Sequence, residues 1–524
     1  MAASGESVPL VGAVGAVART GDKSVKHHIR YFRKGALVDL TLAQLDALAQ
    51  RLARALQDVG FQRHDRVGVL ARNGIEWVLL DLASIKLGLV TAGFEFGKFP
   101  SVAPLADRYR LKGFYSDAPA DVAIDLAGTR DLRPLLAEVL LRVGESDPSP
   151  HRGEQTAVYA QKDITTIKFT SGSTGEPKGL EATVGSIDAS LSAVQAMYHH
   201  RDGDNILVFM PLSLLQQRYW IYSALTFGHD VTVVPFELAL DAARRTDPTV
   251  VMGVPGFYES LRRLIERECL EAGDPAARRA QIESVLGRQV RYMWTGSAPA
   301  NPQTLQFFNE VGFPLYEGYG MNETCIVSKN HPGSERVGSV GKPLPGKRVR
   351  IDDDGVLVVG SDHPVNTAYA YCEPGDSEKI FMPDGEVRTG DLARIDEDGF
   401  LYILGRADDL VVLANGRNVS TRKVEERIKE NGEVAECVLY GSGKAYLVAV
   451  VSPAVTPADS EAIHRHVRAI NETLAPDERV MKTLILPKPL TVESGLLTSQ
   501  FKPRRKEIYK SFQRDIENLY GAVP

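Results

Sequence analysis

Residues 170–179 read TSGSTGEPKG, a run of small and hydroxyl-bearing residues, and they follow an apolar run at residues 164–169 that is typical of a strand. Glycine lets backbone N–H groups approach a polyphosphate, hydroxyl groups add hydrogen-bond donors, and Lys178 supplies a compact positive charge. The stretch therefore predicts a phosphate-binding loop rather than a flexible surface loop. It is not a Walker A loop, because Pro177 stands where that motif has the glycine before its lysine.

Length and composition limit the fold and the class of partner. A chain of 524 residues exceeds what one hydrophobic core usually serves, so at least two domains are expected. The net charge of −6 gives no sign of nucleic-acid binding. Four cysteines without a CxxC pair suit a reducing compartment and argue against a disulfide framework or a zinc site. The sequence contains no run of about 18 apolar residues, the length that would predict a membrane span, so we expect no integral membrane association.

An apolar stretch at residues 8–18 is rich in valine, alanine and glycine. No lysine or arginine precedes it and glycines interrupt it, which argues against a signal peptide. We expect it to be a mostly flexible leader of a cytoplasmic protein.

The first half of the chain alternates between helical and strand patterns. Residues 41–56 carry leucines at helical spacing, and Thr41 with Gln44 forms a capping box. A strand at 67–71, a helix at 76–87 and an apolar run at 89–92 follow. Further strands are predicted at residues 206–210, 231–235, 249–254, 290–295 and 311–315. This alternation indicates a parallel sheet covered by helices, with ligands at the carboxyl ends of its strands.

The pattern changes after residue 349. Short strand-like runs at 356–359, 386–389 and 401–404 alternate with turns rich in Asp and Gly, which predicts a small antiparallel sheet or barrel. A second α/β pattern follows, with strands near 437–440 and 445–451 and a helix near 460–474. We place the domain boundary at Asp408, which gives an N-terminal domain of residues 1–407 and a C-terminal domain of residues 408–524.

Several motifs together resemble the adenylate-forming superfamily, closest to its long-chain fatty acyl-CoA ligase branch. They are TSGSTGEPKG, YEGYGMNET at 316–324, RTGDL at 388–392 and the pattern GLLTxxxKxxR at 495–505. The resemblance runs from about residue 41 to residue 512. It implies a large N-terminal α/β domain of helix-covered sheets with a small β-barrel-like subdomain, followed by a small mobile C-terminal α/β domain that rotates at Asp408.

The resemblance also implies roles for individual residues in binding ATP, Mg2+ and coenzyme A. The phosphate loop would use Lys178 together with Thr170, Ser171, Gly172, Ser173, Thr174 and Gly175. The adenine side would be formed by Tyr319, which stacks on the base, and by Gly296, Ser297, Ala298, Glu317, Gly318 and Gly320. Glu323 would bind Mg2+, and Asn322, where the family usually has threonine, would contact the α-phosphate.

Four further positions complete these expectations. Asp391 would accept hydrogen bonds from the ribose hydroxyls, and Arg406 would lie on the ribose or α-phosphate side. Asn415 and Gly416 would line the pantetheine tunnel. Lys502 would neutralise the charge that develops on the carboxylate and α-phosphate.

The segment MPLSLLQQR at residues 210–218 departs from the family pattern. Leu214 stands where a histidine is common, and Gln217 stands where an acid is common. The position borders the acyl pocket, for which Leu214, Trp220 and Trp294 are the candidate wall residues. We therefore expect an apolar carboxylic acid that is bulkier or more specialised than an ordinary fatty acid.

The implied reaction makes an acyl-adenylate from the acid and ATP and passes the acyl group to coenzyme A. Transfer to the thiol of a carrier protein stays open, as does a homodimer. An amino-acid substrate is disfavoured, because residues 210–218 lack the aspartate that would pair a buried ammonium group. A non-catalytic nucleotide-binding protein is disfavoured by the joint presence of Lys178, Glu323, Asp391, Arg406 and Lys502.

Overall fold

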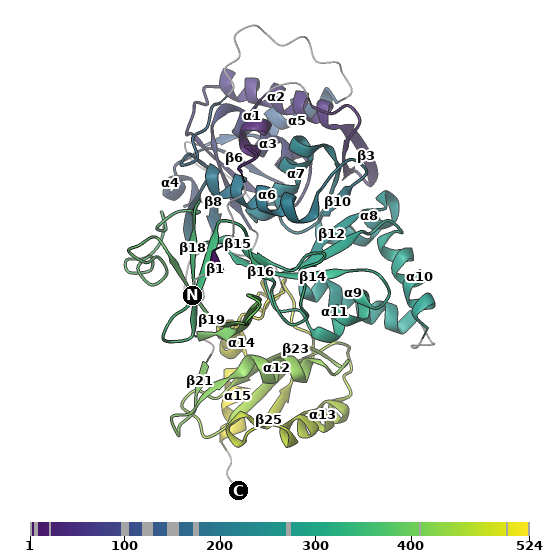
Figure 1. Ribbon diagram of the computed structural model, residues 1–524, viewed down its shortest axis with the longest axis vertical. Coiled ribbons are helices and arrows are strands. Elements are labelled where there is room, and N and C mark those ends of the chain that lie inside the picture. The colour runs from purple at the N-terminus through teal and green to yellow at the C-terminus, as the bar shows by residue number, and fades with distance from the viewer. Residues whose placement is uncertain are drawn as a thin grey trace.

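The computed structural model places two large sheets and an antiparallel sheet in the upper part of the molecule and a smaller α/β unit below them (Figure 1). It describes residues 9–19, 23–95, 104–117, 129–143, 157–170, 178–268, 274–407, 410–498 and 501–521, and the short strand β1 (Ala3–Ser4). The predicted α/β fold class is confirmed.

A six-stranded sheet carries the phosphate loop. Its strand order is β7-β6-β4-β5-β8-β9, and all neighbours are parallel except β8 and β9. The strands are β4 (Arg66–Leu70), β5 (Val90–Phe94), β6 (Leu111–Ser116), β7 (Arg130–Asp131), β8 (Ile164–Phe169) and β9 (Gly179–Thr183). Its helices are α2 (Leu42–Asp58), α3 (Ile75–Leu87), α4 (Leu105–Tyr109) and α5 (Arg133–Leu141). Helix α2 begins with the predicted capping box, in which Thr41 and Gln44 exchange hydrogen bonds.

A nine-stranded sheet lies beside it, in the order β16-β15-β14-β13-β12-β10-β11-β2-β3. The segment from β2 to β14 is parallel, and antiparallel strands close both edges. Its strands are β2 (His28–Arg33), β3 (Ala36–Thr41), β10 (Asn205–Val208), β11 (Asp230–Val233), β12 (Val250–Gly253), β13 (Tyr292–Thr295), β14 (Leu315–Met321), β15 (Cys325–Lys329) and β16 (Lys342–Pro343).

Successive side chains of this sheet point to opposite faces, and helices cover both faces, so the sheet lies between two cores. Tyr292 and Trp294 of β13 face the core that contains α6 (Val184–Tyr198) and α7 (Leu215–Ser223). Met293 faces the opposite core. That second core is built from α8 (Ala239–Thr246), α9 (Pro255–Glu268), α10 (Pro275–Leu286) and α11 (Pro302–Asn309).

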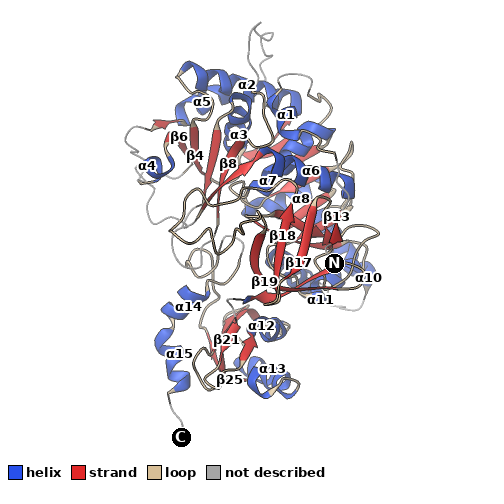
Figure 2. Ribbon diagram, turned by 60° about the vertical axis from the view of Figure 1, so that its left-hand side comes forward, coloured by secondary structure: helices blue, strands red, loops and turns tan. Residues whose placement is uncertain are grey.

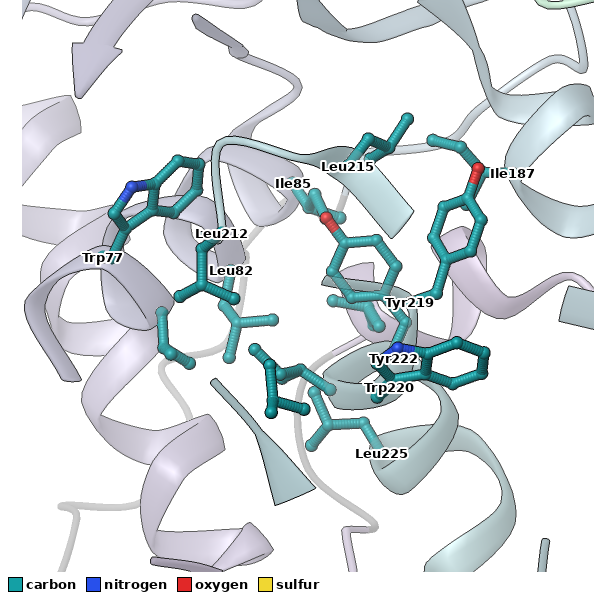
Figure 3. Close-up of a cluster of buried hydrophobic side chains, with 14 of the residues drawn as sticks. Trp77, Leu82, Ile85, Ile187, Leu212, Leu215, Tyr219, Trp220, Tyr222 and Leu225 are labelled. Carbon is teal, nitrogen blue, oxygen red and sulfur yellow. The ribbon is translucent and has the colours of Figure 1, made fainter. Parts of the chain in front are cut away.

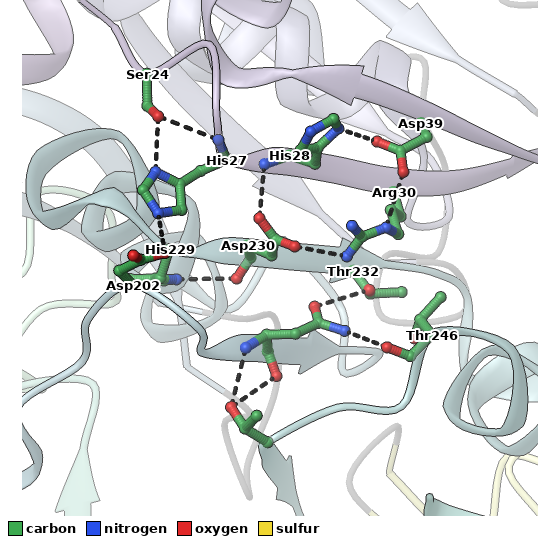
Figure 4. A network of polar contacts seen from close by, with 12 residues as sticks. Ser24, His27, His28, Arg30, Asp39, Asp202, His229, Asp230, Thr232 and Thr246 are labelled. Carbon is green, nitrogen blue, oxygen red and sulfur yellow. Dashed lines mark hydrogen bonds and ion pairs between the residues drawn. The ribbon is translucent and has the colours of Figure 1, made fainter. Parts of the chain in front are cut away.

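A polar network anchors β2 in this sheet (Figure 4). The backbone N–H of His28 donates to Asp230 at 2.8 Å, and Arg30 forms an ion pair with the same carboxylate at 2.8 Å. Further along the strand that carries Asp230, Thr232 donates to the Asn205 side chain of β10 at 3.0 Å. The contacts of His28 and Arg30 with Asp230 hold an N-terminal hairpin in register with a strand about 200 residues further along the chain.

The predicted flexible leader is wrong where the structure describes it. Residues 13–18 form helix α1 (Ala13–Ala18), which is buried against α3, α6 and α7. The backbone N–H of Val14 donates to Asp188 Oδ1 at 3.0 Å, and burial raises the pKa of that carboxyl to about 6. The small apolar side chains that suggested a loose leader are the ones that let a helix fit between other helices.

Residues 347–406 form the predicted antiparallel sheet, with order β1-β17-β18-β19-β20. The strands are β17 (Lys347–Ile351), β18 (Val356–Ser361), β19 (Val387–Ile395) and β20 (Leu401–Arg406). The strand predicted at 311–315 is misplaced, because β14 begins only at Leu315 and runs through the YEGYG motif. Residues before it turn after α11, where Gly312 has a φ of 78° and Phe313 N–H donates to Phe308.

The C-terminal unit is a three-stranded sheet between two pairs of helices (Figure 2). Helices α12 (Thr421–Lys429) and α13 (Ser460–Glu472) pack on one face, and α14 (Arg505–Ser511) and α15 (Gln513–Tyr520) on the other. The strands are β23 (Val434–Tyr440), β24 (Leu447–Pro453) and β25 (Val480–Ile485), preceded by the hairpin β21 (Leu410–Val412) and β22 (Asn418–Ser420). Within the described ranges, no helix has both the length and the apolarity needed to cross a membrane.

The burial of α1 predicts the effect of a charge there. Val14→Asp places a carboxylate beside Asp188 in a site without exposure, so we expect the free energy of unfolding to fall by about 3–5 kcal/mol. Val11→Asp is the matched control, since Val11 is 39% exposed and should tolerate the change. Thermal unfolding monitored by circular dichroism measures both, and equal midpoints for the two variants would contradict a packed α1.

Candidate active site

The phosphate-loop motif connects two antiparallel strands. Strand β8 ends at Phe169, β9 begins at Gly179, and Thr170 N–H donates to the Lys178 carbonyl at 3.0 Å to close the base of the loop. A Cβ on Gly179 would lie 2.8 Å from the Tyr371 ring, so this position needs glycine. The loop residues Ser171, Gly172, Ser173, Thr174 and Gly175 lie outside the described residues.

The structure brings Lys178 and Glu323 to the same place through two residues that the motifs did not indicate. Lys178 Nζ lies 3.1 Å from Asp376 Oδ2 and 5.3 Å from the ring centroid of Tyr369. The Tyr369 hydroxyl donates to Glu323 Oε1. Burial, followed by the charge of Glu323, raises the pKa of Tyr369 far above its usual range. Residues 369–376 resemble no motif, so only their position identifies them.

A second group joins β14 to the antiparallel sheet. The Tyr319 hydroxyl donates to Asp391 Oδ2 at 2.5 Å, and Arg406 Nη1 lies 3.4 Å from Asp391 Oδ1. Asp391 and Arg406 face each other as register partners on β19 and β20. Burial and the Asp391 carboxylate raise the pKa of Tyr319 well above its usual value. Three predicted nucleotide-binding residues from distant segments therefore form one cluster.

The predicted adenine-side loop is held against β14. Glu317 Oε1 accepts a hydrogen bond from Ala300 N–H at 2.9 Å, and burial raises the pKa of Glu317 to about 7. A Cβ on Gly296 would lie 3.1 Å from the Gly318 carbonyl oxygen. Ser297 adopts a positive φ of 71°, which turns the loop between Gly296 and Ala298. The small residues here permit a close backbone approach.

Asn322 ties the end of this motif to the phosphate loop. Its side-chain amide donates to the Phe169 carbonyl at 3.0 Å, and its own carbonyl accepts from Lys168 Nζ at 2.6 Å. Its amide thus contacts the residue that ends β8. Lys168 was not predicted, because it stands inside an apolar strand pattern.

Two of the candidate acyl-wall residues, Trp220 and Trp294, lie in the core that contains α6 and α7, whereas Leu214 is half-buried beside it. Leu214 precedes α7, whereas Trp220 and Trp294 are 0% and 5% exposed. Their rings meet edge to face, with centroids 5.6 Å apart. Figure 3 shows Trp220 and Trp77 at opposite ends of the cluster of side chains around α7. The two tryptophans therefore pack against each other, and their role as a wall of the acyl site stays a prediction.

The C-terminal candidates are placed differently from one another. Lys502 lies in a turn in which its N–H donates to Thr498 Oγ1 at 3.1 Å, and the adjacent Phe501 packs on Phe236 with ring centroids 5.0 Å apart. Asn415 and Gly416 form an exposed turn, where Asn415 donates to Asp477 at 2.9 Å. Among the contacts of the described residues, none joins this turn to Tyr319, Asp391 or Glu323. Asp408 lies outside the described residues.

Comparisons with known proteins identify the family of this chain. A family model described as AMP-binding enzyme matches residues 16–363, and one described as AMP-binding enzyme C-terminal domain matches residues 408–524. The long-chain-fatty-acid–CoA ligase FadD15 of Mycobacterium bovis is 29% identical, and the match covers 93% of each chain.

Solved structures share the fold. ATP-bound MatB from Rhodopseudomonas palustris matches with a TM-score of 0.77 at 23% identity, over 97% of this chain and 100% of that one. The anthranilate CoA ligase AuaEII in complex with anthranoyl-AMP matches with a TM-score of 0.77 at 18% identity, over 96% and 97% of the two chains. Because the AMP-binding model covers well over half of it, the chain belongs to the AMP-binding enzyme family, and the predicted resemblance to adenylate-forming enzymes is confirmed.

Proposed function

We propose that this protein is an ATP-dependent acid–thiol ligase that converts an apolar carboxylic acid to an acyl-adenylate and then to its coenzyme A thioester. The observation that supports this most is the convergence of two groups on β14 and the turn after it. Tyr319, Asp391 and Arg406 suit a nucleoside, and Lys178 with Glu323 suits a polyphosphate.

In the first half-reaction, a carboxylate oxygen attacks the α-phosphorus of ATP. The bond between that phosphorus and the bridging oxygen breaks, and pyrophosphate leaves with the electron pair. Lys178 would hold the phosphates, Asp391 would orient the ribose, and Lys502 would neutralise the charge gathering on the carboxylate and α-phosphate. Positioned charges of this kind often supply the largest part of catalysis.

A magnesium ion fits the donor set that the chain offers. Mg2+ is commonly held by one or two carboxylates together with substrate phosphates and water. Glu323 is a buried carboxylate in the cluster with Lys178, and the described residues contain no group of three or more His, Cys, Asp and Glu that would form a separate metal cage. When bound, Mg2+ would offset phosphate charge, and Glu323 would hold it.

In the second half-reaction, the thiol sulfur attacks the acyl carbon of the adenylate. The bond from that carbon to the AMP oxygen breaks, AMP leaves, and the thiol proton passes to solvent. Two reactions in one site require two arrangements of the C-terminal domain, with a hinge at Asp408. The start of the C-terminal family match at residue 408 supports this boundary. Asn415 and Gly416 would approach the site only in the second arrangement.

A carrier-protein thiol is the competing acceptor. The relative named as a CoA ligase, which matches over 93% of both chains, supports coenzyme A. Pyrophosphate release across aliphatic, aromatic and polycyclic acids, with and without coenzyme A, tests the proposal. With apolar acids, we expect a single turnover of pyrophosphate release without coenzyme A and multiple turnovers when coenzyme A is present. A single turnover in its presence would instead support a carrier protein.

Replacing Lys502 should affect only the first half-reaction. Lys502→Ala removes the cation from the transition state, so we expect pyrophosphate release to slow by about 10²–10³-fold while Mg·ATP binding stays near normal. Supplied with pre-made acyl-adenylate, the variant should form acyl-CoA at nearly the wild-type rate. Lys506→Ala is the control, since Lys506 is exposed on α14. An equal loss in both half-reactions would assign the role to another basic residue.

Proline at the hinge should separate the two half-reactions. Asp408→Pro fixes φ and hinders rotation, so we expect adenylate formation to survive in part and thioester formation to fall much further. Asp408→Ala keeps the backbone free and should leave both rates close to wild type. Single-turnover assays of each step measure the difference. If Asp408→Pro reduces both steps alike, the hinge lies elsewhere.

A further inference from the structure

Lys329 is a buried cation that has no counter-charge among the residues the structure describes. It ends β15, is 0% exposed, and its Nζ has no hydrogen-bond partner among the described residues. Burial alone lowers the pKa of its ammonium group well below the usual range. Lys86 and Arg218 are paired with carboxylates, at 2.7 Å from Asp46 and 2.6 Å from Asp81, whereas the buried Lys168 and Lys347 donate to backbone carbonyls. Among the buried lysines that the structure describes, Lys329 is therefore the one whose Nζ has neither a carboxylate nor a hydrogen-bond acceptor.

Aromatic rings surround the Lys329 ammonium. Its Nζ lies 3.0 Å from the ring centroid of Trp294, 3.9 Å from that of Tyr198 and 5.8 Å from that of Tyr292. These residues come from β13 and α6, and together with Lys329 we call them the Lys329 cage. Cation–π contact stabilises an ammonium group in part but leaves its N–H donors unused.

Two more donors beside the cage lack partners. The indole N–H groups of Trp294 and Trp220 are buried and, within the described part of the chain, donate to no acceptor. The two rings are in edge-to-face contact at 5.6 Å. Native proteins seldom leave buried polar groups unsatisfied, and such exceptions need an explanation. Trp294 contacts both Lys329 and Trp220, so three donors without a partner among the described residues lie next to one another in this part of the core.

The cage lies directly behind the adenine-side loop. Gly318 of β14 pairs with Lys329 of β15, and a Cβ on Gly318 would lie 2.8 Å from Trp294 Nε1 and 3.3 Å from Lys329 Cγ. A Cβ on Gly296 would lie 3.9 Å from the same indole nitrogen. The cage thus adjoins the strand that carries Tyr319, and it includes Trp294 of the candidate acyl wall.

We propose that Lys329, with the indole N–H groups of Trp220 and Trp294, binds a second carboxylate at the far end of the acyl group. This inference rests on the proposed function and narrows its substrate class to acids that are apolar along their length and end in a carboxylate. The second carboxylate supplies the missing counter-charge and accepts from all three donors. Lys329 is then a specificity-determining residue, and the reacting carboxylate lies at the opposite end of the molecule.

The test compares acids of equal chain length: a monocarboxylic acid, the α,ω-dicarboxylic acid and an acid ending in a methyl ketone. We expect the wild-type enzyme to prefer the dicarboxylic acid by at least about tenfold in kcat/KM for pyrophosphate release. Lys329→Met, which keeps the length and removes the charge, should lower kcat/KM for the dicarboxylic acid by about 10²-fold and leave or raise that for the monocarboxylic acid. Lys488→Met, at an exposed position, is the control.

Thermal unfolding gives a readout that does not need turnover. The dicarboxylic acid should raise the melting temperature of the wild-type protein in the presence of AMP but not that of Lys329→Met. The proposal would be overturned if the wild-type kcat/KM were equal for the three acids, or if Lys329→Met lowered kcat/KM equally for all of them. A preference of the wild type for the methyl ketone would also overturn it, because the site would then bind a neutral acceptor. Absence of pyrophosphate release with every acid would refute the proposed function, while the thermal shift would still decide the role of Lys329.

Discussion

The close pairing of β14 with its two neighbours is the constraint on which the site depends. A Cβ on Gly320 would lie 2.3 Å from the Cys325 carbonyl oxygen, and one on Gly318 would meet the Trp294 indole, so neither position admits a side chain. This contact fixes where the parallel part of the nine-stranded sheet ends and the antiparallel edge begins. The residues on and just after β14 are held in place by that junction.

From this strand and the turn after it, contacts reach the other N-terminal residues of the candidate site. Glu317 holds the adenine-side loop, Tyr319 bonds to Asp391 of the antiparallel sheet, and Asn322 bonds to the end of β8. Glu323 accepts from Tyr369, which in turn lies beside Lys178. A ligand in this site would thus contact both large sheets and the small antiparallel one. Such a site at the meeting of sheets suits a substrate as long and as charged as a nucleoside triphosphate.

Buried cations have different partners in the core and at the candidate site. In the core, Arg218 donates to Asp81 and Thr166, so its charge is paired with a carboxylate within the fold itself. At the site, Lys178 pairs with Asp376 and lies over the Tyr369 ring, whereas Lys329 has, among the described residues, aromatic rings in place of a carboxylate. Burying a cation without a partner is costly, so positions where the fold accepts that cost indicate where a ligand completes the electrostatics.

Local patterns determined much of this protein from sequence alone. Helix and strand periodicity and turn chemistry involve residues that are near in sequence, so they can be detected without the structure. Such short-range signals predicted the capping box and leucine spacing of α2 and the alternation of strands and helices. They also include the motifs that contain Tyr319, Glu323, Asp391 and Lys178. The same reasoning failed for residues 8–18 and for the start of β14. There, packing against distant helices and a turn after α11 outweighed composition.

Only the tertiary structure decided which residues meet. Tyr369 and Asp376 carry no motif and become part of the site because the segment between β18 and β19 returns to β9. Lys329 reads in the sequence as an ordinary end of a strand, and its lack of a partner appears only when β13, β15 and α6 are assembled around it. Sequence fixes which chemical groups are present, whereas the burial of a charge and its distance from other groups are properties of the assembled chain.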